Sequence, residues 1–163
     1  MLRRVTLCQT VLQLVHRDTQ PQLWVALQNQ HAMSLAQYPQ GVRADNLEQA
    51  LEVYTRQAFP QEWARTQQNL GITYCERIQG ERIDNLVQAI HNYQQALQVR
   101  TRQDFPEGWA MTQNNLGNAY WERIRGKRAD NSEQAIHNYQ QALGIYTRQD
   151  FPENWAGTAL SFL

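Results

Sequence analysis

A Glu-Arg pair occurs twice in the chain, at Glu76-Arg77 and at Glu122-Arg123. A carboxylate held near a cation can serve in acid–base chemistry. Neither pair is accompanied by a nucleophile with an adjacent base, a Gly-rich phosphate loop or a second carboxylate. The two pairs are repeat equivalents, so a surface ion-pair ladder between stacked units is the simpler interpretation, and such pairs contribute little stability. We therefore expect no enzyme.

The four histidines and two cysteines lack the spacing of metal ligands. His91 and His137 are repeat equivalents, whereas the other two histidines are isolated. No two histidines stand four residues apart, and no carboxylate joins them at ligand spacing. Cys8 and Cys75 form no metal or redox motif, and they do not indicate a disulfide framework. We expect no metal and no other cofactor.

The charge balance limits the classes of partner. Lys and Arg number 15, and Asp and Glu also number 15, so the net charge is zero. Nucleic-acid-binding domains normally carry a basic stripe, which argues against that class. No apolar run approaches the roughly 20 residues of a membrane span. The first 15 residues resemble a signal peptide only superficially, because polar residues interrupt them and no small-residue cleavage site follows. We expect a cytoplasmic protein.

An internal repeat organises the chain. Residues 60–105 and 106–151 are two blocks of 46 residues with 31 identical positions. A divergent copy precedes them and another copy begins after them, so we expect one array over 1–163. Its parts are the end of a second helix (1–20), a shortened repeat 1 (21–59), repeat 2 (60–105), repeat 3 (106–151) and the start of a further first helix (152–163).

Repeat 1 has 39 residues, seven fewer than the others. Repeat 2 contains Gln88-Ala89-Ile90 and, seven residues later, Gln95-Ala96-Leu97, whereas repeat 1 has only Gln49-Ala50-Leu51. Seven residues are about two helical turns, so their loss shortens a helix by roughly 10 Å and rotates its face by only about 20°. The deletion therefore predicts a shortened second helix in repeat 1.

Each repeat is predicted to form two helices, because apolar residues recur every three to four positions. No segment alternates at period two, so no sheet is expected. Proline marks the first turn of each first helix, and aspartate is expected to cap each second helix. The prolines are Pro60, Pro106 and Pro152; the caps are Asp45, Asp84 and Asp130; the stops between helices are Gly80 and Gly126.

These helices resemble the tetratricopeptide repeat (TPR). The family's Leu-Gly-x2-Tyr motif appears as Leu70-Gly71 with Tyr74, and its Ala-x3-aromatic-x2-Ala motif as Ala89, Tyr93 and Ala96. Repeat 3 has both motifs, whereas repeat 1 departs from the first. The 46-residue unit exceeds the usual length of about 34 by two insertions of about six. The resemblance implies an all-α fold, a right-handed solenoid of stacked antiparallel helix pairs. The glycine predicts close helix approach.

The resemblance also implies a concave groove, formed by one face of each first helix, that binds a peptide. The groove residues are Arg65, Gln68, Asn69 and Ile72 in repeat 2, and Met111, Asn114, Asn115, Asn118 and Trp121 in repeat 3. Amide side chains can pair with a peptide backbone in both directions. Arg65 beside Asn69 partly resembles the family's carboxylate clamp, but Gly157 and Ser161 stand where its remaining basic pair would be. The alternative is a merely solvated polar face.

Tryptophan occurs in two settings. One recurs at the start of each first helix, at Trp24, Trp63, Trp109 and Trp155, on the apolar stripe, where core packing is expected rather than a ligand site. The other is Trp121. Its equivalent in repeat 2 is Cys75, so packing does not require an aromatic ring there. Trp121 is either an interface hot spot or a residue packed on the last, partial repeat.

The function expected from these patterns is a non-catalytic protein–protein interaction scaffold with a protein or peptide partner, and neither nucleic acid nor membrane. The alternative is a self-assembly module, because both ends present incomplete apolar stripes that a second copy could cover by end contact or helix exchange in a homodimer. Further repeats of a longer array are the other way in which these stripes could be covered. The residues of these stripes are Val11, Leu12, Val15, Trp155, Phe162 and Leu163.

Overall fold

The computed structural model describes residues 7, 10–34, 40–77, 80–123 and 128–162. Within these residues the chain is helical, with no strand, which confirms the all-α prediction. A short helical stretch spans 10–14. The longer helices are α2 (Pro21–Ser34), α3 (Gln40–Val53), α4 (Pro60–Glu76), α5 (Arg82–Leu97), α6 (Pro106–Glu122), α7 (Arg128–Leu143) and α8 (Pro152–Phe162).

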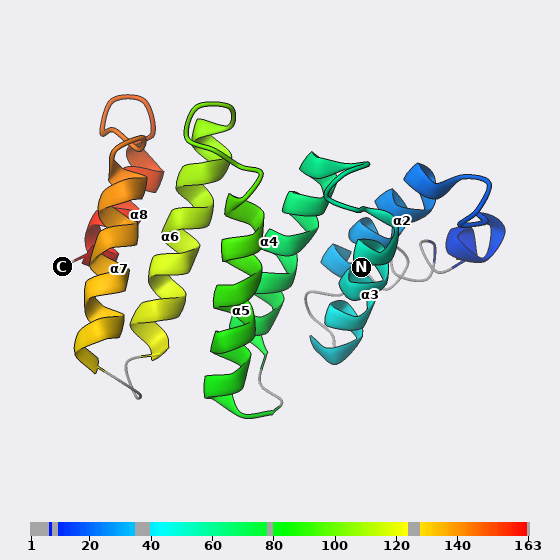
Figure 1. Ribbon diagram of the computed structural model, residues 1–163, viewed down its shortest axis with the longest axis horizontal. Helices are drawn as coiled ribbons and strands as arrows, with labels where there is room; N and C mark the ends of the chain where they lie inside the picture. The colour runs from blue at the N-terminus through cyan, green and yellow to red at the C-terminus, as the bar shows by residue number, and fades with distance from the viewer. Residues whose placement is uncertain (1–6, 8–9, 35–39, 78–79, 124–127, 163) are drawn as a thin grey trace.

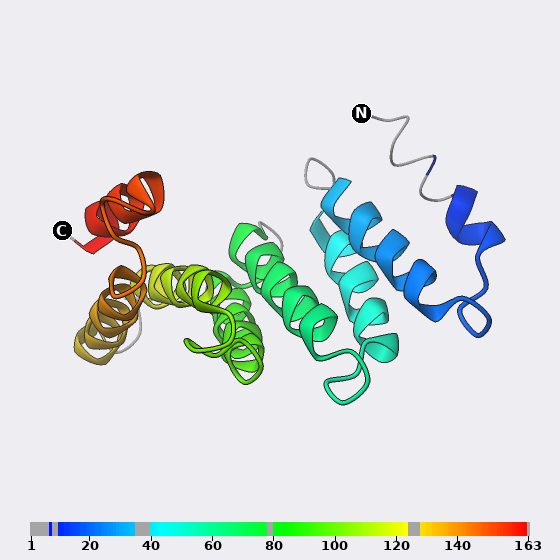
Figure 2. The same cartoon turned by 90° about the horizontal axis from the view of Figure 1, so that it is seen from above.

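The helices stand in a row along the long axis, with α2 toward one end and α8 at the other (Figure 1). Each helix from α2 to α7 packs against the next one in the chain, and α4 also touches α6. Figure 2 shows the same row from above, where successive helices turn relative to their neighbours. Chain neighbours are thus spatial neighbours, so a side chain can contact the equivalent region of the following repeat.

The predicted prolines begin the first helices. Pro60 and Pro106 occupy the first turns of α4 and α6, and α8 begins at Pro152. Phe59 and Phe105 precede α4 and α6 without a side-chain capping bond, which suits a helix whose first residue has no N–H to satisfy. The proline prediction is confirmed.

The predicted aspartate caps are wrong. Glu81 is the N-cap of α5, so Asp84 lies within the first turn, and Asp130 lies within the first turn of α7. Asp45 lies inside α3. The two first-turn carboxylates still interact favourably with the helix dipole, but α5 begins at Arg82 and α7 at Arg128, two residues before these aspartates.

Gly80 supplies the turn between α4 and α5. Its φ of +81° lies in the left-handed region, which glycine adopts without strain, so the predicted stop is confirmed. The corresponding stop at Gly126 lies outside the described residues.

The seven residues that repeat 1 lacks fall in and just after its second helix. Asp45-Asn46 matches Asp84-Asn85, 39 positions later, whereas Thr55-Arg56-Gln57 matches Thr101-Arg102-Gln103, 46 positions later. α3 ends at Val53, seven residues after Asn46, whereas α5 ends at Leu97, twelve residues after Asn85. Five of the missing residues therefore belong to the second helix, as predicted, and two belong to the turn that follows it.

The core lies between consecutive helices. The largest cluster joins the apolar face of α5 to α6 through Leu86, Ile90, Tyr93 and Leu116. Tyr93 of α5 lies against Gly71 of α4, and Tyr139 of α7 lies against Gly117 of α6 in the same way. Both glycines are buried, which confirms the predicted close approach of the helices.

Candidate protein-interaction site

The recurring tryptophans form part of the core, as expected. Trp24 and Trp63 pack against a cluster around Tyr54, and Trp109 and Trp155 pack against one around Tyr146. An arginine from the preceding loop lies over each indole ring at 5.7–6.0 Å from the ring centroid. These arginines are Arg17, Arg56, Arg102 and Arg148. The four rings are therefore half-buried, each with an arginine over it, and do not offer a row of free ligand platforms.

Three of these arginines also bond the following repeat, at the C-terminal end of its second helix or at the residue directly after that helix. Arg17 donates to Glu52 at 2.9 Å, Arg56 donates to Oε1 of Gln98 at 2.5 Å, and Arg102 donates to the carbonyl oxygen of Gly144 at 3.3 Å. The three acceptors stand at equivalent repeat positions. The loop arginines thus link consecutive repeats. We call these arginines and their three acceptors the seam, because their contacts are structural.

The Glu-Arg pairs belong to helix–helix contacts. Arg43 donates to Glu76 at 2.8 Å, and Arg82 donates to Glu122. Each bond joins the second helix of one repeat to the first helix of the next. Both glutamates therefore have cationic partners from another helix, an arrangement that matches the ion-pair interpretation.

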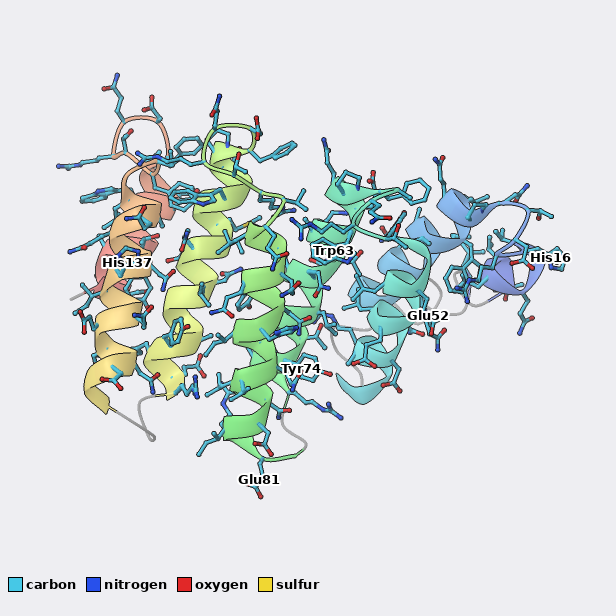
Figure 3. The ribbon with its side chains drawn as sticks, viewed as in Figure 1. His16, Glu52, Trp63, Tyr74, Glu81 and His137 are labelled. Carbon is cyan, nitrogen blue, oxygen red and sulfur yellow. The ribbon has the colours of Figure 1, made fainter. Side chains whose placement is uncertain are left out.

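Tyrosine hydroxyls bond across the same helix–helix interface. Tyr74 donates to Glu48 at 2.8 Å, and burial together with this bond raises the pKa of Tyr74 to about 12. In the next repeat, Gln94 donates to the hydroxyl of Tyr120 at 3.2 Å. In Figure 3, Trp63 and Tyr74 lie toward opposite ends of α4, so the seam and this tyrosine bond hold α4 at both ends.

The histidines do not converge. His16 and His137 lie near opposite ends of the row (Figure 3), and both are exposed. His31 is buried, and Asn46 donates to its Nδ1 at 3.1 Å. Burial lowers the pKa of His31. Among the described residues, no group of three His, Cys, Asp or Glu side chains could hold a metal ion.

The residues predicted for the groove divide into inward and outward sets. Gln68 is buried and accepts a hydrogen bond from Arg100. Ile72 packs against the core, and Asn118 accepts a hydrogen bond from Tyr139 at 2.8 Å. Asn69, Asn114 and Asn115 are half-buried, and Arg65, Met111 and Trp121 are exposed.

Trp121 has the most open position of the aromatic side chains. It is 52% exposed, and every other Trp, Tyr and Phe whose side chain the structure describes is buried or half-buried. Its equivalent, Cys75, is held inside by Tyr93, which donates to its Sγ at 3.7 Å, and burial raises the pKa of that thiol. Met111, 40% exposed, lies ten residues earlier on α6, about 15 Å along the axis.

A hollow of about 460 Å³ opens between the first turns of α4 and α6. Arg65, predicted for the groove, lines it, and so does Arg100, which was not predicted as a site residue. The sequence held a signal for Arg100: tyrosine stands at the equivalent positions 54 and 146. This replacement of tyrosine by arginine at a core position was therefore visible in the sequence.

No protein-family model matches the chain, and no curated protein matches it as a relative. Within the described residues, no helix combines the length and the apolar composition needed to cross a membrane.

Proposed function

We propose that this chain is a non-catalytic protein–protein interaction scaffold, a TPR-like right-handed solenoid of antiparallel helix pairs that acts in the cytoplasm. Its partner is a protein or peptide that binds along the face formed by α4 and α6. The internal repeat and the contacts between consecutive helices support the solenoid assignment.

The exposure of Trp121 carries this proposal. A tryptophan side chain that is half in water loses much of the apolar burial that would stabilise the fold, and the repeat does not require it. Tryptophan is also the residue type most enriched at interface hot spots. With Met111 it gives α6 two exposed apolar groups, and Arg65 adds a cationic group on α4.

Peptide selection followed by titration tests the proposal. Peptides selected from a random display library on the intact chain are titrated into ¹⁵N-labelled protein. The expected result is a shift of the Trp121 indole N–H and of α4 and α6 amides. Trp121→Ala should weaken binding by about 30-fold, the loss of a 2 kcal/mol hot spot.

The matched control is Ile83→Ala, which removes an exposed apolar side chain from α5 instead. Its binding should equal that of the wild type. Shifts that map to α5 and α7, or equal affinities for the Trp121→Ala and wild-type chains, would contradict the proposed face.

A second candidate function, self-association, is favoured by Ile136. Its equivalent, Ile90, is 5% exposed because α6 covers it, whereas Ile136 on α7 is 41% exposed. At the other end Leu7 and Leu14 are exposed. A second copy could cover both surfaces.

The residues predicted for self-association have different surroundings. Val11, Leu12 and Val15 are half-buried, and Trp155 packs in the core. The side chain of Phe162 and the whole of Leu163 lie outside the described residues. Sedimentation equilibrium tests the idea: Ile136→Asp should dissociate the oligomer and Ile83→Asp should not. A wild-type chain that sediments as a 19.1 kDa monomer at tens of micromolar would rule it out.

A further inference from the structure

Arg100 stands where the neighbouring repeats bury a tyrosine. Tyr54 and Tyr146 are buried, and each packs against the phenylalanine five residues later with ring centroids 5.6 Å apart. The corresponding phenylalanine in repeat 2, Phe105, has Arg100 in place of that tyrosine and lines a hollow of about 460 Å³. The hollow therefore occurs where the sequence leaves the repeat pattern.

The walls of the hollow combine charged and apolar groups. The first turns of α4 and α6 form two sides, and the segment after α5 forms a third. Arg65 and Arg100 supply positive charge, and Glu62 and Glu107 supply negative charge. The remaining lining residues are Gln61, Val99, Phe105, Pro106 and Gly108.

The guanidinium of Arg100 has a neutral partner in the structure. It donates to Oε1 of Gln68, which is only 3% exposed. Among the described residues, neither Arg100 nor Arg65 has a carboxylate at ion-pair distance. Burial, and then the nearby charge of Arg65, lower the pKa of Arg100. A half-buried cation without an anion opposes folding, so an incoming anion would relieve this cost.

We propose that this hollow binds one side-chain carboxylate, that of a glutamate in the partner peptide, between Arg65 and Arg100. This inference rests on the proposed function and names the chemistry of the partner. Guanidinium groups bind carboxylates through paired, charge-assisted hydrogen bonds. Glu107 and Gly108 also line the hollow, and their first-turn N–H groups have no acceptor within their own helix.

The other lining groups decide between anions. Glu62 and Glu107 make the formal charge of the lining zero, so a singly charged carboxylate meets less repulsion than a doubly charged phosphate. Val99, Phe105 and Pro106 give apolar walls that suit the two methylene groups of a glutamate stem. That stem lets the carboxylate enter the hollow while the peptide backbone stays on the α4–α6 face.

The test uses the intact ¹⁵N-labelled chain and blocked tripeptides. The probe is acetyl-Leu-Glu-Leu-amide, and the Nε–Hε signals of Arg65 and Arg100 and the amide of Gly108 are followed. Saturable shifts of these signals are expected, with the acetyl-Leu-Gln-Leu-amide peptide at least about tenfold weaker because it lacks the charge. Equal binding of the two peptides would overturn the proposal.

Two further probes identify the source of the anion. Acetyl-Leu-Leu with a free C-terminal carboxylate and acetyl-Leu-phosphoserine-Leu-amide should both bind more weakly than the glutamate peptide. Tighter binding of the first would assign the hollow to a chain terminus, and tighter binding of the second to a phosphate; either outcome would overturn the glutamate assignment.

Two variants connect the binding to the named arginine. Arg100→Tyr, which restores the residue of repeats 1 and 3, should abolish the shifts at Arg65 and Gly108. Arg148→Gln removes an arginine that stacks on Trp155 away from the hollow and should leave them unchanged. Retained binding by Arg100→Tyr would refute the site. The outcome is separable from the proposed function, which is measured with selected peptides at Trp121.

Discussion

The ring of Tyr93 lies so close to Gly71 that a Cβ atom added to this glycine would be 2.6 Å from Cε1 of the tyrosine. Tyr139 and Gly117 repeat this relationship, again at 2.6 Å. In both repeats the glycine belongs to the first helix and the tyrosine to the second. The absence of a side chain on one helix thus sets how closely the two can pack.

Gly71→Ala is therefore expected to destabilise the chain by about 1–3 kcal/mol, because the buried Tyr93 ring must leave its place. This cost should exceed the gain of about 1 kcal/mol in helix propensity. Urea unfolding followed by circular dichroism measures the change. Gly157→Ala is the control: nothing lies within 4 Å of its added Cβ, so this variant should gain stability.

The loop arginines give a second prediction. Arg56 lies over Trp63 and also donates to Gln98, whereas Arg148 lies over Trp155 in the same way without a bond to a following repeat among the described residues. Arg56→Gln should cost about 1 kcal/mol and Arg148→Gln about 0.5 kcal/mol. Thermal unfolding of both variants provides the comparison. Equal losses would mean that the bond between repeats contributes nothing measurable.

The sequence predicted the features that depend on a single residue's backbone chemistry. Proline fixes φ at the helix starts, and glycine permits the positive φ of the turn at Gly80. The close helix approach at Gly71 was predicted because glycine within a helix costs helix propensity, which tight packing must offset. Features that depend on competition between neighbouring positions were less predictable. Asp84 is a good capping residue, yet α5 begins two residues before it.

The candidate site was predicted only in part, for a related reason. Arg65 and Trp121 were assigned to the groove by their positions in the resembled repeat motif, and both are exposed. The surroundings of Arg100 depend on what the missing tyrosine ring leaves open between α4 and α6. Ile72 was also assigned to the groove by motif position, but it is half-buried and packs against the core cluster that contains Ile90 and Tyr93.

His31 predicts a dependence of stability on pH. Burial lowers the pKa of His31, and its Nδ1 accepts a bond from Asn46, so the folded chain favours neutral imidazole. Below the ordinary value of 6.5 the unfolded state binds a proton that the folded state does not, so this group destabilises the fold as the pH falls.

The change that tests this dependence is His31→Leu, since leucine stands at the equivalent position 70. The variant should lose less stability than the wild type between pH 7 and pH 5, measured by chemical denaturation at both values. His91→Gln, at an exposed position on α5, should retain the wild-type dependence. A pH dependence identical in His31→Leu and wild type would show that His31 titrates alike in both states.

Arg100 predicts a trade between stability and binding. Arg100→Tyr removes a half-buried cation and restores the ring that packs on phenylalanine in repeats 1 and 3, an aromatic contact of about 0.5–1.5 kcal/mol. Its Tm should rise by about 2–4 °C for each kcal/mol gained. Gln68 loses its donor in this variant, so Gln68→Asn with Arg100→Tyr, which gives the residues that repeat 3 carries at positions 114 and 146, is measured beside it. Arg65→Met, which copies Met111 at the exposed position of α4, should leave Tm within about 1 °C of the wild type, since surface substitutions rarely change stability. If Arg100→Tyr lowers Tm instead, Arg100 stabilises the repeat. The half-buried cation would then impose no stability cost for a bound anion to relieve.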